Sequence, residues 1–265
     1  MRLHWEDTGG AGPPVLLIMG LGMTATGWWR TVPVLVEAGL RVIAFDNRGV
    51  GRSERPPGPY TVAEMADDAV SVLDAAGVER AHVYGISLGG MIAQELALRC
   101  PERVRALVLG ATTGGGAHFV PAGEAVNTVV QLRAQMTAEY AVWASVPLNY
   151  AARTRREHGD RIAEDIEQRL RFPVEPEFYA AQLAAAHAHD ARVADISAPT
   201  LVVHGTEDVL IPPANGERLA AAIPDADLTL WPDAAHLYFT DEPEADRGVA
   251  RWLRRLSARS SPGPS

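Results

Sequence analysis

Short runs of apolar residues recur along this chain and predict β-strands. The runs are apolar throughout rather than alternating with polar residues, which is typical of parallel strands covered on both faces. Most are followed directly by Gly, Asp or Pro, residues that end strands. The predicted strands occupy residues 15–19, 42–45, 83–84, 106–109, 200–204 and 228–231.

Helical patterns lie between these runs. Residues 62–76 carry apolar side chains at helical spacing, and Gly77 follows as a C-cap. Residues 88–100, 214–223 and 244–256 show similar patterns. Strands that alternate with helices predict an α/β protein with a mostly parallel, doubly wound sheet.

The segment 115–190, here called the cap, breaks this rhythm. It contains helical patterns at 126–136, 162–170 and 177–188, separated by prolines, and no convincing strand. We therefore predict a helical cap inserted between two strands of a core formed by residues 1–114 and 191–256. The Ser-, Pro- and Gly-rich residues 257–265 are expected to be a disordered tail.

Composition narrows the possible partners and location. The 265 residues, 47% of them hydrophobic, suffice for one large domain with an insertion. The net charge of −9 argues against a nucleic-acid partner, and the single cysteine, Cys100, allows no internal disulfide. No signal-peptide pattern and no run of about 18 apolar residues is found. We expect a cytoplasmic protein with no membrane partner.

The pentapeptide at 85–89, Gly-Ile-Ser-Leu-Gly, is the strongest chemical signal. It follows a predicted strand and opens a predicted helix, the setting in which Gly-x-Ser-x-Gly forms a nucleophile elbow. Such a turn projects the hydroxyl of Ser87 away from both elements. It also places the N–H of Leu88 at a helix N-terminus, where it can stabilise an oxyanion.

A serine hydroxyl needs a base, and the base needs an orienting acid. In this setting the chain order is serine, acid, histidine. Asp208 follows the predicted strand 200–204, and His236 follows the strand 228–231. The other seven histidines lie near strands or in the cap, so Ser87, Asp208 and His236 form the predicted catalytic triad.

Further site residues follow from neighbouring loops. The loop 19–23 is Met-Gly-Leu-Gly-Met, and its glycines would aim the N–H of Leu21 at the oxyanion. Trp28 and Trp143 are candidate substrate contacts and favour a small-molecule substrate with an apolar or aromatic acyl or alcohol part, although core packing explains such residues equally well or better. The pair His187 and His189 lacks helical ligand spacing, so we expect no metal site and no cofactor.

Four ordered motifs together resemble the α/β-hydrolase superfamily. Residues 46–53, Asp-Asn-Arg-Gly-Val-Gly-Arg-Ser, are similar to its Asp-x-Arg-Gly-x-Gly-x-Ser segment, and the elbow, the 204–208 loop and His236 match its catalytic regions. The chain is most similar to 3-oxoadipate enol-lactone hydrolases and to methylesterases that trim polyketide antibiotics. Because Ser87 occupies the nucleophile position, the similarity to haloalkane dehalogenases and epoxide hydrolases stops at the fold.

This resemblance implies the α/β-hydrolase fold and a serine hydrolase that cleaves a carboxylic ester or lactone through an acyl-enzyme on Ser87. Other reactions supported by the same triad stay open, namely natural-product tailoring, C–C bond hydrolysis and cofactor-free perhydrolysis. A non-catalytic binding protein with this fold also stays open. The sequence leaves the oligomeric state undetermined.

Overall fold

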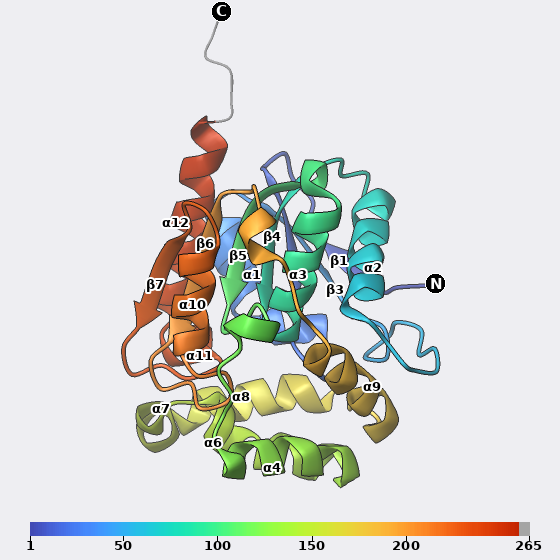
Figure 1. Ribbon diagram of the computed structural model, residues 1–265, viewed down its shortest axis with the longest axis vertical. Helices are drawn as coiled ribbons and strands as arrows, with labels where there is room; N and C mark the ends of the chain where they lie inside the picture. Colours follow the sequence, from blue (N-terminus) through green and yellow to red (C-terminus); the bar gives the residue numbers. More distant parts are fainter. Residues whose placement is uncertain (260–265) are drawn as a thin grey trace, which may run out of the picture.

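A seven-stranded sheet forms the centre of the molecule in the computed structural model, which describes residues 1–259 (Figure 1). The strand order is β1-β3-β2-β4-β5-β6-β7, and all neighbours are parallel except β1 and β3. The strands are β1 (Trp5–Asp7), β2 (Pro14–Ile18), β3 (Arg41–Phe45), β4 (Ala81–Ile86), β5 (Val104–Gly110), β6 (Thr200–Gly205) and β7 (Asp227–Trp231).

All six predicted strands are present, and the predicted mostly parallel α/β architecture is confirmed. Central strands such as β2 and β4 are buried along almost their whole length, which explains why their sequences are largely apolar. The sequence missed β1. This three-residue edge strand is only partly buried and therefore carries no apolar run.

Two helical layers cover the sheet because alternate strand residues point to opposite faces. Leu16 and Ile18 pack with α2 (Val62–Ala75), α3 (Leu88–Arg99) and α10 (Ala214–Ala222). Val15 and Leu17 pack instead with α1 (Thr31–Glu37) and α12 (Glu244–Arg259). A short helix, α11 (Tyr238–Asp241), precedes α12.

The cap connects β5 to β6 and lies at one end of the sheet, below it in Figure 1. Its two ends are joined by an antiparallel bridge between Gly115 and Asp190. Its α-helices are α4 (Glu124–Leu132), α5 (Ala138–Ala144), α6 (Val146–Asn149), α7 (Ala152–Glu157), α8 (Gly159–Leu170) and α9 (Pro176–His187). Short 3₁₀ turns also occur, among them η4 (Arg133–Gln135).

The C-terminal helix is longer than the sequence pattern indicated. Helix α12 ends at Arg259, three residues inside the segment predicted to be a disordered tail, and residues 260–265 lie outside the described part of the chain. None of the helices in residues 1–259 combines the length and the apolar composition that a membrane crossing requires.

Helix α3 approaches the sheet at backbone distance through Gly89. A Cβ atom at this position would lie 2.0 Å from the carbonyl oxygen of Ile18 in β2, far inside van der Waals contact. Since both partners are backbone, neither can rotate away. The close approach fixes the position of the residue that begins the helix, Leu88, and of Ser87 before it.

We expect Gly89→Ala to lower the free energy of unfolding by about 1–3 kcal/mol or more, because the methyl group must displace the helix from the strand. Urea unfolding monitored by circular dichroism measures the change. The matched control is Gly159→Ala at the start of α8, where a Cβ would meet nothing within 4 Å. Equal stability of the two variants would contradict the assigned packing role.

Candidate active site

Ser87 lies in a sharp turn between β4 and α3. Its backbone has φ 55° and ψ −123°, a conformation that L-residues rarely adopt. The turn requires glycine on either side of the serine, since a Cβ at Gly85 would lie 2.1 Å from the carbonyl oxygen of Gly89. The pentapeptide therefore folds as the strained elbow that its sequence predicts.

Asp208 and His236 come together from loops that follow neighbouring strands, β6 and β7. The Nδ1 atom of His236 lies 2.8 Å from Oδ2 of Asp208. Because an ionised carboxylate only accepts hydrogen bonds, Nδ1–H is the donor, which leaves Nε2 free to accept a proton. The structure thus gives His236 the tautomer that a general base needs.

The carboxylate of Asp208 accepts three hydrogen bonds, one from His236 and two from backbone N–H groups. Its Oδ1 accepts the N–H groups of Leu210 and Ile211, each at 2.9 Å. Its Oδ2 also lies 3.3 Å from Nε2 of the buried His204. Complete burial alone would raise the pKa of Asp208, but the charge and hydrogen bond of His236 and the interaction with His204 outweigh it and lower this pKa to about 2. Asp208 is therefore ionised wherever the protein is folded near neutral pH.

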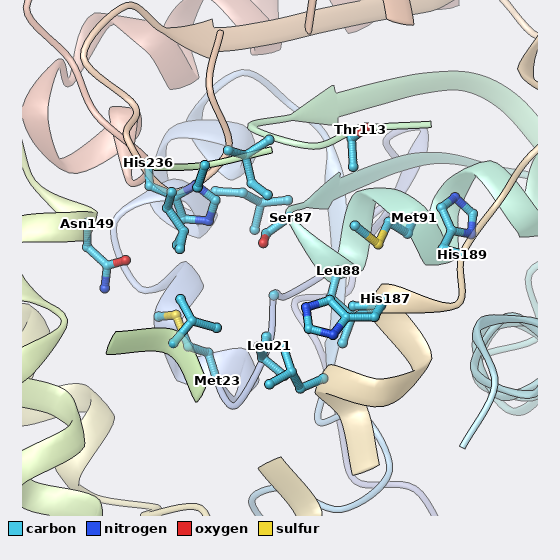
Figure 2. A pocket seen from close by; sticks show the side chains of 18 of the residues that line it. Leu21, Met23, Ser87, Leu88, Met91, Thr113, Asn149, His187, His189 and His236 are labelled. Atoms are coloured by element: carbon cyan, nitrogen blue, oxygen red, sulfur yellow. The ribbon is translucent and has the colours of Figure 1, made fainter. Parts of the chain in front are cut away.

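Ser87 and His236 line the same cavity, which has a volume of about 470 Å³. Figure 2 shows the two side chains at one wall of this cavity. Within residues 1–259 the Ser87 hydroxyl makes no hydrogen bond, to His236 or to any other group. Such contacts often tighten only when substrate is bound.

The candidate oxyanion donors flank Ser87. Leu88 is the first residue of α3, so its N–H has no partner inside the helix. The loop after β2 passes directly against the serine, since a Cβ at Gly20 would lie 3.1 Å from Cβ and 3.6 Å from Oγ of Ser87. Leu21, next in this loop, lines the cavity together with Leu88 (Figure 2).

A cap residue that sequence reasoning missed fixes this loop. The fully buried Gln182 of α9 accepts the N–H of Gly22 at 2.9 Å and donates to the carbonyl oxygen of Arg48 at 2.8 Å. From the core, Asn47 donates to the carbonyl oxygen of Met19 at 3.0 Å. No local pattern marks Gln182, because its partners lie far away in sequence.

Comparison with known proteins agrees with this geometry. The pattern described as the alpha/beta hydrolase fold matches residues 13–243, most of the chain. The chain belongs to the alpha/beta hydrolase family. The resemblance found in the four sequence motifs is thereby confirmed.

Three similar proteins indicate the range of this hydrolase family. A Variovorax paradoxus relative named as a carbamate hydrolase, RutD, is 37% identical over 99% of this chain and 100% of its own length. The 2-hydroxy-6-oxononadienedioate/2-hydroxy-6-oxononatrienedioate hydrolase of Burkholderia vietnamiensis is 33% identical over 96% of this chain and 92% of its own. The enol-lactonase of Burkholderia xenovorans superimposes with a TM-score of 0.83 at 27% identity, covering 97% of this chain and 96% of that one.

The two tryptophans predicted to contact substrate lie outside the cavity of the hydrolase. Trp28 is fully buried in the core, where its ring packs against Tyr84 and Phe239 at centroid distances of 4.8 and 5.5 Å. Trp143 is 52% exposed on α5. This prediction is corrected: the ring of Trp28 packs in the core, and the ring of Trp143 lies on the surface of the cap.

Aliphatic and sulfur-containing side chains supply most of the cavity wall instead. They include Met19, Leu21, Met23, Met91, Leu183 and Ile211. His187 and His189 of the cap also line the cavity (Figure 2). Within residues 1–259, no cluster of three or more His, Cys, Asp or Glu side chains is arranged to hold a metal ion.

We expect Gln182→Leu to reduce kcat, because the N–H of Gly22 loses its acceptor and the Leu21 loop loosens. The reduction should not exceed the about 10²–10³-fold cost of losing one oxyanion donor. Steady-state kinetics on an activated ester measure it. Gln131→Leu, an exposed position on α4, is the control. A wild-type kcat for Gln182→Leu would contradict the role assigned to this side chain.

Burial of His189 should make stability depend on pH. Burial lowers its pKa from an ordinary 6.5 to about 4, against a smaller opposing effect of Asp190. The unfolded chain therefore binds a proton that the folded chain does not between these pH values, so stability falls as the pH decreases from 6.5 to 4.

Removing this histidine should flatten that dependence. We expect His189→Gln to reduce the loss of unfolding free energy between pH 7 and pH 4.5 by about 2 kcal/mol. Denaturant titrations at the two pH values measure it. The same substitution at the exposed His187 controls for the chemical change. An identical pH dependence in wild type and His189→Gln would refute the assignment.

Proposed function

We propose that this hydrolase cleaves a carboxylic ester or lactone through an acyl-enzyme on Ser87. One observation carries the proposal. Ser87 is held on a strained elbow in the wall of a cavity that His236 also lines. The Nδ1–H of His236 donates a hydrogen bond of 2.8 Å to Oδ2 of Asp208. Nucleophile, base and orienting acid are the parts that acyl transfer needs.

In the proposed reaction Nε2 of His236 takes the hydroxyl proton while Oγ of Ser87 attacks the substrate carbonyl. The N–H groups of Leu21 and Leu88 stabilise the oxyanion that develops. Asp208 stays ionised and stabilises the imidazolium. His236 then protonates the leaving alcohol, and a water molecule activated by the same ring releases the acid product.

The ester or lactone class is supported by the structural likeness to an enol-lactonase. The apolar side chains of the cavity wall suit the hydrocarbon part of a small-molecule substrate. C–C bond hydrolysis is a second candidate, because a 33% identical relative is a hydrolase of that class. The name of the RutD relative adds carbamates to the substrates worth testing. All three reactions begin with attack on a carbonyl carbon.

We expect Ser87→Ala to reduce kcat on the best ester by roughly 10⁴–10⁶-fold, because no other group can form the acyl-enzyme. A fluorophosphonate probe should label wild-type Ser87 stoichiometrically and should not label His236→Ala. Ser71→Ala, at an exposed serine of α2, is the control and should retain full activity. Unimpaired ester turnover by Ser87→Ala would refute the proposal.

The substrate panel separates the alternatives. Turnover of a vinylogous 1,5-diketone without turnover of esters would favour C–C hydrolysis, and turnover of carbamates alone would favour the chemistry named for RutD. Peroxide-dependent formation of a peracid would indicate perhydrolysis. Tight binding of a carbonyl compound that is never turned over would identify a binding protein instead.

A further inference from the structure

Two arginines of the cap line the same cavity as the candidate catalytic residues. Arg133 belongs to the turn η4, and Arg169 lies in the last turn of α8. Each side chain is only 9% exposed. Arginine is seldom buried to this extent unless a counter-charge pairs with it. The partners of these two guanidinium groups therefore decide their role.

Neither arginine forms an ion pair with any of residues 1–259. Other shielded arginines do pair with an acid: Arg41 contacts Asp7 at 2.5 Å, and Arg48 contacts Asp68 at 2.6 Å. Carboxylates are not scarce, since 33 Asp and Glu residues face 24 Lys and Arg residues. A shortage of acidic residues therefore does not explain why these two arginines have no acidic partner among residues 1–259.

The two acids nearest to Arg169 in sequence form no ion pair with it among residues 1–259: Glu167 is exposed, and Asp165 is committed elsewhere. Asp165, one helical turn earlier, accepts hydrogen bonds from Trp29 at 2.9 Å, Arg30 at 3.2 Å and Thr240 at 2.7 Å. Both of its oxygens are used by these donors. The carboxylate therefore fastens the cap to the core and leaves the Arg169 charge unpaired.

Neutral groups hold the two guanidinium groups in place. Arg169 donates from Nη1 to the hydroxyl of Ser145 at 3.1 Å and lies beside the Tyr150 hydroxyl. Arg133 lies over the ring of Tyr179, 4.8 Å from its centroid, and its buried Nε has no hydrogen-bond partner within residues 1–259. These contacts orient the side chains but supply no negative charge.

The two positive charges also repel each other, and the described residues of the cavity wall supply no negative charge to balance them. No Asp or Glu is among the described residues that line the cavity. Burial lowers the pKa of Arg133, and the neighbouring charge of Arg169 lowers it further. Uncompensated burial of charge is unfavourable, so an anion that enters the cavity and accepts these free donors would bind strongly.

We infer that Arg133 and Arg169 form an anion-binding subsite and that the substrate is an ester or lactone bearing a carboxylate. This inference rests on the proposed function of the same cavity. The carboxylate would accept hydrogen bonds from both guanidinium groups, while the apolar wall holds the chain between it and the reacting carbonyl. The arginines would bind and orient the substrate, and the chemistry would stay with Ser87 and His236.

Matched ester pairs test the subsite on either side of the reacting bond. Monomethyl adipate and methyl hexanoate differ by a carboxylate in the acyl part, and 6-acetoxyhexanoate and hexyl acetate differ by one in the alcohol part. We expect the carboxylate to raise kcat/KM at least about 10-fold in one pair. Arg133→Met and Arg169→Met should each reduce that preference about 10- to 100-fold, with little effect on the neutral ester.

Two further variants separate binding from structure. Arg133→Lys keeps the charge without the planar fork and should retain part of the preference. Arg171→Met removes an exposed arginine that directly follows α8, hydrogen-bonds Gln168 and does not line this cavity among the described residues, so it should change nothing. We also expect Arg133→Met to have a Tm no lower than wild type, because an unpaired buried charge is replaced by an apolar chain of similar length.

Calorimetric titration with hexanoate and hexanamide distinguishes failure of this inference from failure of the proposed function. Ester turnover without a carboxylate preference, or a preference that survives in both Met variants, overturns the subsite and leaves ester hydrolysis standing. Hexanoate binding that is selective over hexanamide and lost in Arg133→Met, without turnover of any ester, supports the subsite and overturns ester hydrolysis. Neither turnover nor selective binding overturns both.

Discussion

The backbone contact between α3 and the sheet is the constraint on which the rest of the site depends. Because Gly89 has no side chain, α3 can lie close to β2, and Ser87, which connects β4 to α3, adopts a strained backbone conformation. The N–H of Ser87 donates to the carbonyl oxygen of Gly110 at 2.9 Å, and the hydroxyl of Thr112 donates to the carbonyl oxygen of Ser87 at 2.7 Å. These contacts offset a backbone strain of about 1–3 kcal/mol. The elbow thereby places Ser87 in the wall of the cavity.

Buried charges on the two sides of that cavity differ in whether the described chain provides them with partners. On the core side, three hydrogen-bond donors and the nearby ring of His204 surround the carboxylate of Asp208, and its pKa falls although the group is fully buried. On the cap side, Arg133 and Arg169 keep their charges without an acidic partner in the described chain. A satisfied charge fixes geometry, whereas an unsatisfied one favours a ligand that completes it. The first arrangement suits the reaction and the second suits selection of the substrate.

The cap contributes to both functions through single residues. Gln182 accepts a hydrogen bond from the loop that contains Leu21, and the two arginines add positive charge to the cavity wall. Ion pairs and hydrogen bonds such as those of Asp165 fasten the cap to the core. Changes in the cap can therefore alter the substrate without altering the chemistry, which is consistent with the variety of reactions named among similar proteins.

The sequence by itself determined the core fold, because fully buried parallel strands require continuous apolar runs and an elbow requires glycine at fixed positions around Ser87. It also predicted that Asp208 and His236 lie on loops at one edge of the sheet, since parallel strands end there, and the two side chains do meet at that edge. Only the tertiary structure decided what the cap side chains do. Trp28 and Trp143 are of a residue type common in binding sites, but Trp28 lies in the core and Trp143 on the surface. Arg133 and Arg169 look like ordinary helix-surface residues in the sequence, and their burial against a cavity depends on contacts between segments far apart in the chain.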